Sequence, residues 1–408
     1  MTYTNRHAEK TFAILSEMFG AVLVTGARQV GKSTMLEHLT EGIPLLSFDD
    51  AAVISSATDA PGLFFEYNKP PVFLDEIQKA PDLFPQMKLI LDRSKKKGQF
   101  FLSGSQQFEM MENVSESLSG RIGIINLLGI SMREENGDVF DEPFTPTPSY
   151  FSARTETRVH KAPDKVWARI WRGSMPELLL NPKFDWSKFY GAYLRTYIER
   201  DVRQIIQATD LMKFQTFMSA AAARTGGLLN LSDMAKDVGI SQPTAQSWLS
   251  VLLATNIVYL LRPYHTNLTK RAVKTPKMFF LDTGLAAYLT KWTTPDVLAG
   301  GAMSGEFFET FVVSEILKSY YNTGELDLPL YFYRDKEKNE IDLLIIKDGI
   351  AHPLEIKKTT APNSGDISSF KLLDKLEGVR RGHGGVICFS DKLLPISGTD
   401  TSIPISYL

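Results

Sequence analysis

The sequence predicts an α/β protein of several domains whose first domain carries a phosphate-binding loop. Three observations support this prediction. Residues 10–130 alternate short apolar runs with helical patterns, a glycine-rich motif ending in Lys-Ser follows the first run, and apolar runs return after residue 328. Strands that alternate with helices imply crossover connections and a mainly parallel sheet. We therefore expect an α/β domain, a helical middle and a second α/β domain.

The first domain is expected to contain five strands. Each is a short apolar run bounded by turn residues: 21–25, 44–48, 71–74, 99–103 and 122–128. The segment 137–151 is rich in Pro and Thr, which predicts a linker or flexible loop. Helical patterns then fill residues 164–225.

The C-terminal part returns to apolar runs at 328–334, 340–346, 352–358 and 384–390, which predict the strands of the second α/β domain. The expected domains are a P-loop α/β core at 1–136, a linker with a helical lid-like region at 137–225, a winged-helix-like domain at 226–282, and the second α/β domain at 283–408.

Composition is that of an ordinary globular protein, and 408 residues exceed one domain of about 150. The chain has 45 basic and 47 acidic side chains, so no overall charge attracts nucleic acid or a membrane. Its single cysteine, Cys388, excludes an internal disulfide and a cysteine-based zinc site. No apolar run approaches the ~20 residues that span a bilayer, and the N-terminal segment lacks the pattern of a signal peptide. We expect a soluble cytoplasmic protein without a membrane partner.

The segment from Gly26 to Ser33 matches the phosphate-loop pattern GxxxxGK[ST], between a predicted strand and a helical run. Gly26 and Gly31 let backbone N–H groups converge on phosphates at a helix N-terminus. Lys32 brings a positive charge to the β and γ oxygens, and the Ser33 hydroxyl reaches Mg²⁺. The predicted ATP-binding residues are Gly26, Ala27, Arg28, Gln29, Val30, Gly31, Lys32, Ser33 and Thr34.

Two carboxylates, Asp75 and Glu76, end the third predicted strand. Behind a phosphate loop, Asp75 is expected to hold Mg²⁺ through water, and Glu76 to act as the base that polarises the attacking water. The alternative is a solvated acidic pair that merely closes a strand. The fourth strand ends in Gly104 and Ser105, where Ser105 is expected either to orient water or the γ-phosphate, or to form a plain turn.

Residues 231–252 predict a helix-turn-helix. Met234, Ala235 and Val238 form the apolar face of its first helix, Gly239 makes the turn, and Ser241 caps the second helix. Residues 241–253 contain no Lys or Arg, which phosphate contacts need, so both a DNA-binding and a protein-binding role remain open. A following stretch without acidic residues offers cations at Arg262, Lys270, Arg271, Lys274 and Lys277.

A second set of charged residues lies on two consecutive strands near the C-terminal end. Asp342 stands 13 residues before Glu355, and Lys357 follows Glu355 on the same face of its strand. Asp342 and Glu355 are expected to bind a second Mg²⁺ or Mn²⁺, with Lys357 beside an attacking water. The alternative is a binding module without metal chemistry. The preceding helix offers Glu306, Glu309 and Glu315, and its periodicity does not choose between them.

Together, several segments resemble the bacterial and archaeal family of AAA-type ATPases with a C-terminal domain of unknown function. They are the phosphate loop, LDE, LSGSQQ, SLSGRIGI, RGSMPELL and YLRTYIERDV. The resemblance implies that the C-terminal domain has the PD-(D/E)xK restriction-endonuclease-like fold and that Glu309 is its third carboxylate. It also implies that Arg121 is an arginine finger reaching a neighbouring subunit of a homo-oligomer; an ordinary salt-bridge arginine is the alternative. Arg172 stands where a glycine is common in the family, which puts any sensor role of that loop in doubt.

These features predict an ATP-hydrolysing switch or motor whose nucleotide state controls a nuclease-like domain acting on DNA. The competing prediction is an ATP-driven switch that binds or remodels a protein partner and has an inactive nuclease-like domain. A third interpretation is a metal-dependent nuclease that ATP merely gates.

Overall fold

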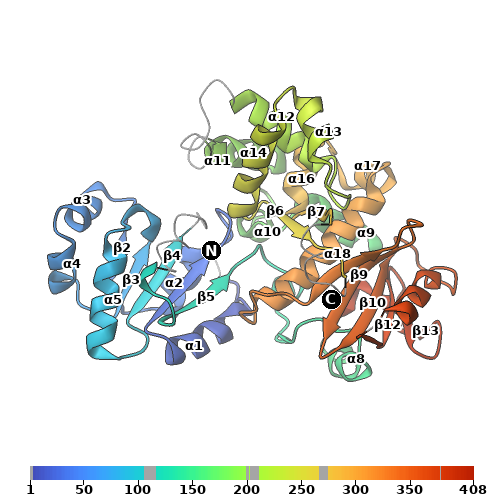
Figure 1. The fold of residues 1–408 in the computed structure, drawn as a ribbon, viewed down its shortest axis with the longest axis horizontal. Coiled ribbons are helices and arrows are strands. Elements are labelled where there is room, and N and C mark those ends of the chain that lie inside the picture. Colours follow the sequence, from blue (N-terminus) through green and yellow to red (C-terminus); the bar gives the residue numbers. More distant parts are fainter. Residues whose placement is uncertain (1–2, 105–115, 199–201, 203–210, 266–273, 377) are drawn as a thin grey trace. The chain divides into compact units, whose positions relative to one another are not determined.

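The computed structural model describes residues 3–104, 116–198, 202, 211–265, 274–376 and 378–408 (Figure 1). The chain forms two compact units. The first unit contains Met1–Ile130 together with Ala254–Asn256 and Tyr321–Leu326, and the second contains the remaining residues. The four-domain division from the sequence remains a prediction.

In the first unit, the described residues form a five-stranded parallel sheet in the order β2-β3-β4-β1-β5. All five predicted strands are confirmed. Strand β4 lies between β1 and β3, so the carboxyl ends of these three strands meet at one edge of the sheet. The bounds are β1 Ala21–Thr25, β2 Leu45–Ser47, β3 Val72–Asp75, β4 Phe100–Gly104 and β5 Ile122–Asn126.

Helices connect the strands of this sheet and bury its apolar side chains. Helix α1 packs against β1 and β5, and α2 packs against β4. Leu23, Leu74 and Leu102 on three neighbouring strands are completely buried, as continuous apolar runs of a parallel sheet require. The helix bounds are α1 Ala8–Met18, α2 Lys32–Leu39, α3 Ala51–Asp59, α4 Pro61–Tyr67 and α5 Leu83–Ser94, with the 3₁₀ turn η1 at Ile77–Lys79.

The second unit begins with a segment that departs from the sequence prediction. A linker or flexible loop is expected at residues 137–151, but helix α8 (Pro148–Thr155) starts within them, after the short α7 (Met132–Glu135). Phe144 is completely buried, its N–H donates to Ser319 Oγ at 3.0 Å, and its carbonyl accepts from Tyr320 at 3.0 Å. The aromatic residues of the segment anchor it, and the Pro- and Thr-based prediction gives them too little weight.

The helical middle of the second unit ends in two short helices and a hairpin. Asn230 caps α13, Gly239 ends it with a left-handed backbone (φ 70°), and the Ser241 hydroxyl accepts from the Thr244 N–H before α14. The antiparallel pair β6–β7 follows. The bounds are α9 Pro163–Arg172, α10 Pro176–Leu180, α11 Trp186–Tyr197, α12 Leu211–Ala222, α13 Leu231–Val238, α14 Gln242–Ala254, β6 Val258–Leu261, β7 Lys277–Phe280, α16 Thr283–Leu289 and α17 Pro295–Gly300.

A mixed sheet follows helix α18 (Ser304–Tyr321) in the second unit. Strands β8, β9 and β10 form an antiparallel meander, and β12 and β14 continue the sheet in parallel. Inward positions on β9 such as Ile341 and Leu343 are fully buried, while Glu340 and Asp342 alternate with them. The bounds are β8 Leu330–Arg334, β9 Glu340–Lys347, β10 Ile350–Ile356, η4 Ser368–Lys375, β11 Arg380–Arg381, β12 Gly384–Cys388, β13 Leu394–Pro395, β14 Asp400–Pro404 and η5 Ile405–Tyr407.

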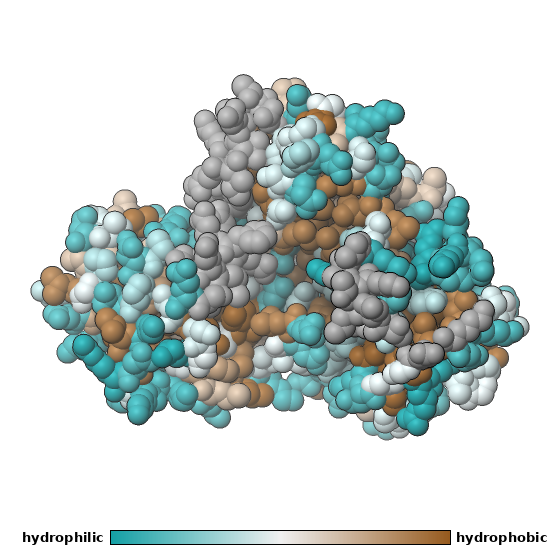
Figure 2. Space-filling view, in the orientation of Figure 1, coloured by the Kyte–Doolittle hydropathy of each residue, from teal (hydrophilic) through white to brown (hydrophobic). Residues whose placement is uncertain are grey.

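The surface of the first unit mixes polar and apolar residues. On its visible face, hydrophilic and hydrophobic side chains are interspersed (Figure 2). Scattered exposed apolar residues are normal for water-facing surfaces. Within the described ranges, no helix is both long enough and apolar enough to pass through a membrane.

Candidate nucleotide site and C-terminal carboxylate cluster

The phosphate loop connects β1 to α2 and depends on glycine at two positions. Gly26 has φ 148°, and a Cβ atom there would lie 2.1 Å from the carbonyl oxygen of Leu127. Gly31 has φ 93° and occupies the N-cap position of α2. Left-handed backbone and close approach both favour glycine. The loop therefore has the form that turns backbone N–H groups toward an anion at a helix N-terminus.

Lys32 and Ser33 point into this loop. Lys32 is 7% exposed, and its ammonium donates to the carbonyl oxygens of Gly26 at 3.1 Å and Ala27 at 2.8 Å. Ser33 donates to Asp75 Oδ1 at 2.7 Å, so the loop and the end of β3 are in direct contact. Backbone donors, a buried ammonium and a hydroxyl beside a carboxylate together fit a triphosphate with Mg²⁺.

Two hydroxyls that the sequence analysis did not single out hold the acidic pair. Ser103 on β4 donates to Asp75 Oδ1 and accepts from the Glu76 N–H at 3.2 Å, and Ser47 on β2 donates to Asp75 Oδ2 at 3.4 Å. Glu76 has φ 56°, which is uncommon for a residue other than glycine. The available signal is a small polar residue near the end of a strand, which the sequence contains at Ser103 as well as at the predicted Ser105.

Ser105 lies outside the described residues. Arg121, just before β5, donates through Nε to Asp92 Oδ1 at 2.6 Å and through a terminal nitrogen to the Ser119 carbonyl at 2.9 Å. Both side chains of this ion pair are about one third or more exposed to solvent. An exposed pair of this kind contributes ~0–1 kcal/mol, so it does not fix the guanidinium in place. The arginine-finger role stays a prediction.

Arg6 is a further residue at the phosphate loop, and no sequence motif predicts it there. Its guanidinium donates to the carbonyl oxygens of Val30 at 2.9 Å and Leu128 at 2.7 Å, and the residue is 6% exposed. Arg6 therefore joins the loop to the segment that follows β5. A lone arginine near the chain start carries no motif, so the sequence offered no signal for it.

The C-terminal candidates come together in the second unit. Asp342 on β9 and Glu355 on β10 lie on neighbouring antiparallel strands, and Lys357 lies 2.9 Å from Glu355 and 3.5 Å from Asp342. Of the three helix glutamates, Glu309 joins this group, whereas Glu306 is exposed and Glu315 pairs with Lys318 at 2.7 Å. We call Glu309, Glu340, Asp342 and Glu355 the carboxylate cluster.

Lys277, the first residue of β7, lies inside the carboxylate cluster. Its ammonium is 2.6 Å from Glu340, 2.8 Å from Glu309 and 3.9 Å from Asp342, and its side chain is 4% exposed. The basic stretch 262–277 is predicted as a set of cations for DNA, but a buried Lys277 cannot contact a phosphate backbone. Within the described ranges, no group of three or more His, Cys, Asp or Glu residues is arranged to hold a metal ion.

Charge and burial perturb the titration of this cluster. Burial alone would lower the pKa of Lys277, but Glu309, Asp342 and Glu340 raise it above its ordinary value. Burial, with repulsion from Asp342 and against the attraction of Lys277, raises the pKa of Glu309 to about 7. Burial and repulsion from Asp342 likewise raise the pKa of Glu355 to about 8, although Lys357 lies beside it. The acids are therefore poorly solvated and depend on the two lysines.

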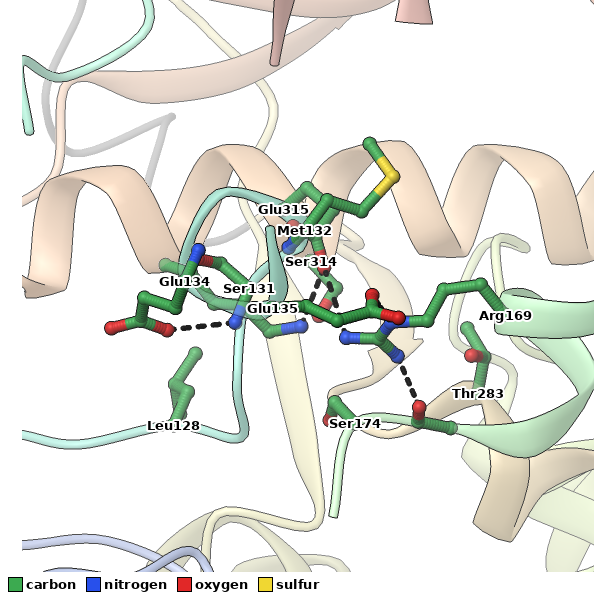
Figure 3. Close-up of polar contacts among 12 residues, drawn as sticks. Leu128, Ser131, Met132, Glu134, Glu135, Arg169, Ser174, Thr283, Ser314 and Glu315 are labelled. Carbon is green, nitrogen blue, oxygen red and sulfur yellow. Dashed lines mark hydrogen bonds and ion pairs between the residues drawn. The ribbon is translucent and has the colours of Figure 1, made fainter. Parts of the chain in front are cut away.

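The RGSMP segment forms a buried polar network. Arg169 points toward Glu135 and donates to its Oε2 at 2.9 Å (Figure 3). Burial alone would raise the pKa of Glu135, but Arg169 and Lys161 hold it below its ordinary value. Ser174 donates through both N–H and Oγ to Asp282 Oδ2, at 2.6 and 2.7 Å. These contacts hold the loop against the N-terminus of α16. They give the RGSMP residues a structural role that requires no nucleotide-sensing function.

Comparison with family models bears on the nucleotide site. Residues 19–136 match a model described as an AAA domain. This part of the chain is an AAA-type P-loop ATPase domain. The AAA domain contains the phosphate loop, Asp75, Glu76, Ser103 and Arg121. Residues 163–296 and 304–408 match two further models, each described only as a domain of unknown function. The restriction-endonuclease-like fold of the C-terminal part therefore stays a prediction.

The sequence similarity to known proteins extends beyond the AAA domain. An uncharacterized protein of Mycobacterium bovis and one of Mycobacterium tuberculosis are each 26% identical over 387 residues, 94% of this chain and 79% of theirs. The Walker-type ATPase of Pyrococcus abyssi is similar over 70% of this chain and 96% of its own, at 15% identity and a TM-score of 0.45. The RuvB Holliday junction branch migration motor of Thermotoga maritima is similar over 62% of this chain and 88% of its own, at 16% identity and a TM-score of 0.29.

Proposed function

We propose that the AAA domain binds ATP with Mg²⁺ and hydrolyses it, and that its nucleotide state controls the C-terminal part of the chain. The observation that supports this proposal is the convergence of the phosphate loop with Asp75 and Glu76 at one sheet edge. Ser33 donates to Asp75 at 2.7 Å, so the two proposed Mg²⁺-holding residues already lie in contact. When bound, Mg²⁺ would neutralise charge on the phosphate oxygens.

In this proposal each residue of the site has one task. Lys32 places its ammonium against the β and γ oxygens, which replace the carbonyls of Gly26 and Ala27 as its acceptors. Glu76 accepts a proton from the attacking water, which makes the water a better nucleophile. Arg121 is proposed to serve a neighbouring subunit in a homo-oligomer, and Ser105 to orient the water or the γ-phosphate.

DNA is the proposed partner of the helix-turn-helix segment. Gln242 and Gln246 at the start of α14 are exposed, and so are Arg262 and Lys274 beside the hairpin. Amide side chains can bond to base edges, and exposed cations can contact phosphates. Control of a nuclease would need a metal at the C-terminal carboxylates, but the buried Lys277 ammonium lies 2.8 Å from Glu309 and 3.9 Å from Asp342. That position favours the second candidate function, an ATP-driven switch that binds its partner without cutting it.

The test separates binding from hydrolysis. Glu76→Gln should bind ATP like the wild type while its turnover falls by roughly 10²–10⁴-fold, since only the base is removed. Lys32→Ala should lose the thermal stabilisation that ATP with Mg²⁺ gives the wild type. Wild-type turnover in Glu76→Gln, or an unchanged thermal shift in Lys32→Ala, would contradict the proposed site.

A second measurement addresses the partner. The ATPase rate of the wild type is measured with and without duplex or single-stranded DNA, at low and at physiological salt. Stimulation that weakens as salt rises is expected if DNA contacts the exposed cations. A rate that no DNA form changes would favour a protein partner.

A further inference from the structure

Lys277 is held in place by its backbone. It pairs with Leu261 across the β6–β7 hairpin and forms a bridge with Leu228 on its other side. The flanking residues also form backbone hydrogen bonds with residues 226–229: the Pro276 carbonyl accepts one, and Met278 both accepts one and donates one. The side chain lies over the Phe332 ring, with the ammonium 5.6 Å from the ring centroid. A strand residue fixed on both sides directs its ammonium to one place, unlike a flexible surface lysine.

The place it reaches is the position a divalent ion would need. A metal shared by Glu309 and Asp342 must contact oxygens of both at roughly 2.0–2.6 Å. The Lys277 ammonium already bonds to Glu309 at 2.8 Å and lies 3.9 Å from the same Asp342. On the other side, Lys357 lies between Asp342 and Glu355. Two ammonium groups therefore flank Asp342, and the Mg²⁺ or Mn²⁺ expected at Asp342 and Glu355 does not fit this arrangement.

The charge balance agrees with this interpretation. Three side-chain cations lie beside the four acids of the carboxylate cluster. They are Lys277, Lys357 and Arg334, and the Arg334 guanidinium lies 3.4 Å from Glu340. Carboxylates so close together require a nearby positive charge, and side-chain cations already supply it. Adding a divalent ion beside a buried ammonium would place like charges in contact, which disfavours binding of the ion.

We propose that Lys277 is the built-in cation of the carboxylate cluster and that it excludes a divalent metal from Asp342 and Glu309. A lysine side chain of the hairpin thereby provides the positive charge that a metal ion would otherwise provide. The cluster joins β7 to α18 and β9 electrostatically. This inference does not depend on ATP hydrolysis.

The experiment measures Mn²⁺ binding to the full chain without nucleotide, by titration with detection of free Mn²⁺ by electron paramagnetic resonance. The variants are the wild type, Asp342→Asn, Lys277→Met and Lys277→Met with Asp342→Asn. Methionine keeps the length of the lysine stem and can pack on Phe332. Wild type and Asp342→Asn should bind Mn²⁺ identically, because the cluster is closed to it. Lys277→Met should gain one Mn²⁺ per chain, and the double variant should lose it.

Two results would overturn the proposal. The first is a wild-type Mn²⁺ site that Asp342→Asn removes, which needs no variant of Lys277 and so does not depend on how that variant folds. The second is a Lys277→Met protein that melts cooperatively and gains no Mn²⁺ relative to the double variant. In the first case the cluster is an ordinary metal site, and in the second something other than Lys277 keeps the metal out.

Discussion

Ser103 donates a hydrogen bond to Asp75 although the two residues lie on different strands, β4 and β3. The same hydroxyl accepts the N–H of Glu76 at 3.2 Å, so one side chain contacts both residues of the acidic pair. Glu76 adopts a left-handed backbone, which costs about 1–3 kcal/mol and persists only where the surrounding contacts hold it. Ser103 makes one of those contacts, and it holds the proposed base in a defined position.

Replacing Ser103 by Ala should therefore lower ATP turnover more than ATP binding. Loss of a hydrogen bond to a carboxylate costs about 1.5–3 kcal/mol, or roughly ten- to hundredfold if it is felt only in the transition state. Turnover and the dissociation constant of ATP are measured separately. Ser47→Ala is the matched control, because its hydroxyl is 3.4 Å from the other Asp75 oxygen and should matter less. Equal turnover in Ser103→Ala and wild type would show that the contact does not position the base.

The sequence was sufficient for the parallel sheet and the phosphate loop because both depend on local patterns. Apolar runs of four or five residues predict buried strands, and GxxxxGKS predicts the loop that follows β1. It was not sufficient for Ser103, because the insertion of β4 between β1 and β3 is a property of strand order, which no local pattern encodes. The hydroxyl beside Asp75 becomes evident only once that order is known.

Lys277 is a second residue whose role depends on contacts that the local sequence does not reveal. Its neighbours in the sequence are basic and lack acidic residues, which favours a surface role at DNA. Its actual partners are distant in the chain, Glu309 being 32 residues away. A lysine is almost never fully buried without such partners, and the sequence does not show them. Phe144 was missed for a similar reason, since Pro and Thr around it suggest a flexible segment.

Arg121 offers a prediction about assembly. Its ion pair with Asp92 is exposed and weak. The guanidinium can therefore leave this carboxylate and contact a phosphate of the nucleotide bound to a neighbouring subunit. Arg121→Ala should bind ATP normally and lose about 10³–10⁵-fold in turnover, the range for arginine fingers. Asp92→Ala is the control that removes the ion pair and keeps the arginine, and it should retain wild-type turnover.

Mixing two inactive variants tests whether this arginine acts between subunits. Arg121→Ala keeps the base, and Glu76→Gln keeps the finger, so a mixed assembly contains some interfaces with both. Turnover should rise above the sum of the separate proteins. A protein that sediments as a monomer at full ATPase activity would exclude the role.

The last prediction concerns Gly173, in the loop fastened to α16. It has φ 87°, and a Cβ atom would lie 2.1 Å from the Tyr190 hydroxyl oxygen and 2.7 Å from Asp282 Oδ1. Tyr190 donates to that same carboxylate at 2.6 Å, so a methyl group would push apart a buried hydrogen-bonded pair. Gly173→Ala should therefore destabilise the second unit by about 2–4 kcal/mol, from backbone strain and overpacking together.

Tryptophan fluorescence measures this unit alone, because all five tryptophans of the chain lie between residues 167 and 292. Urea unfolding is followed at that signal for wild type, Gly173→Ala and Gly239→Ala. Gly239 has φ 70°, and a Cβ atom added there would meet no described atom within 4 Å, so its variant carries the backbone strain without the clash. It should lose only about 1 kcal/mol. Equal decreases in the free energy of unfolding of the two variants would mean that Tyr190 and Asp282 move aside at no energetic cost. The loop would then be held less firmly than its hydrogen bonds imply.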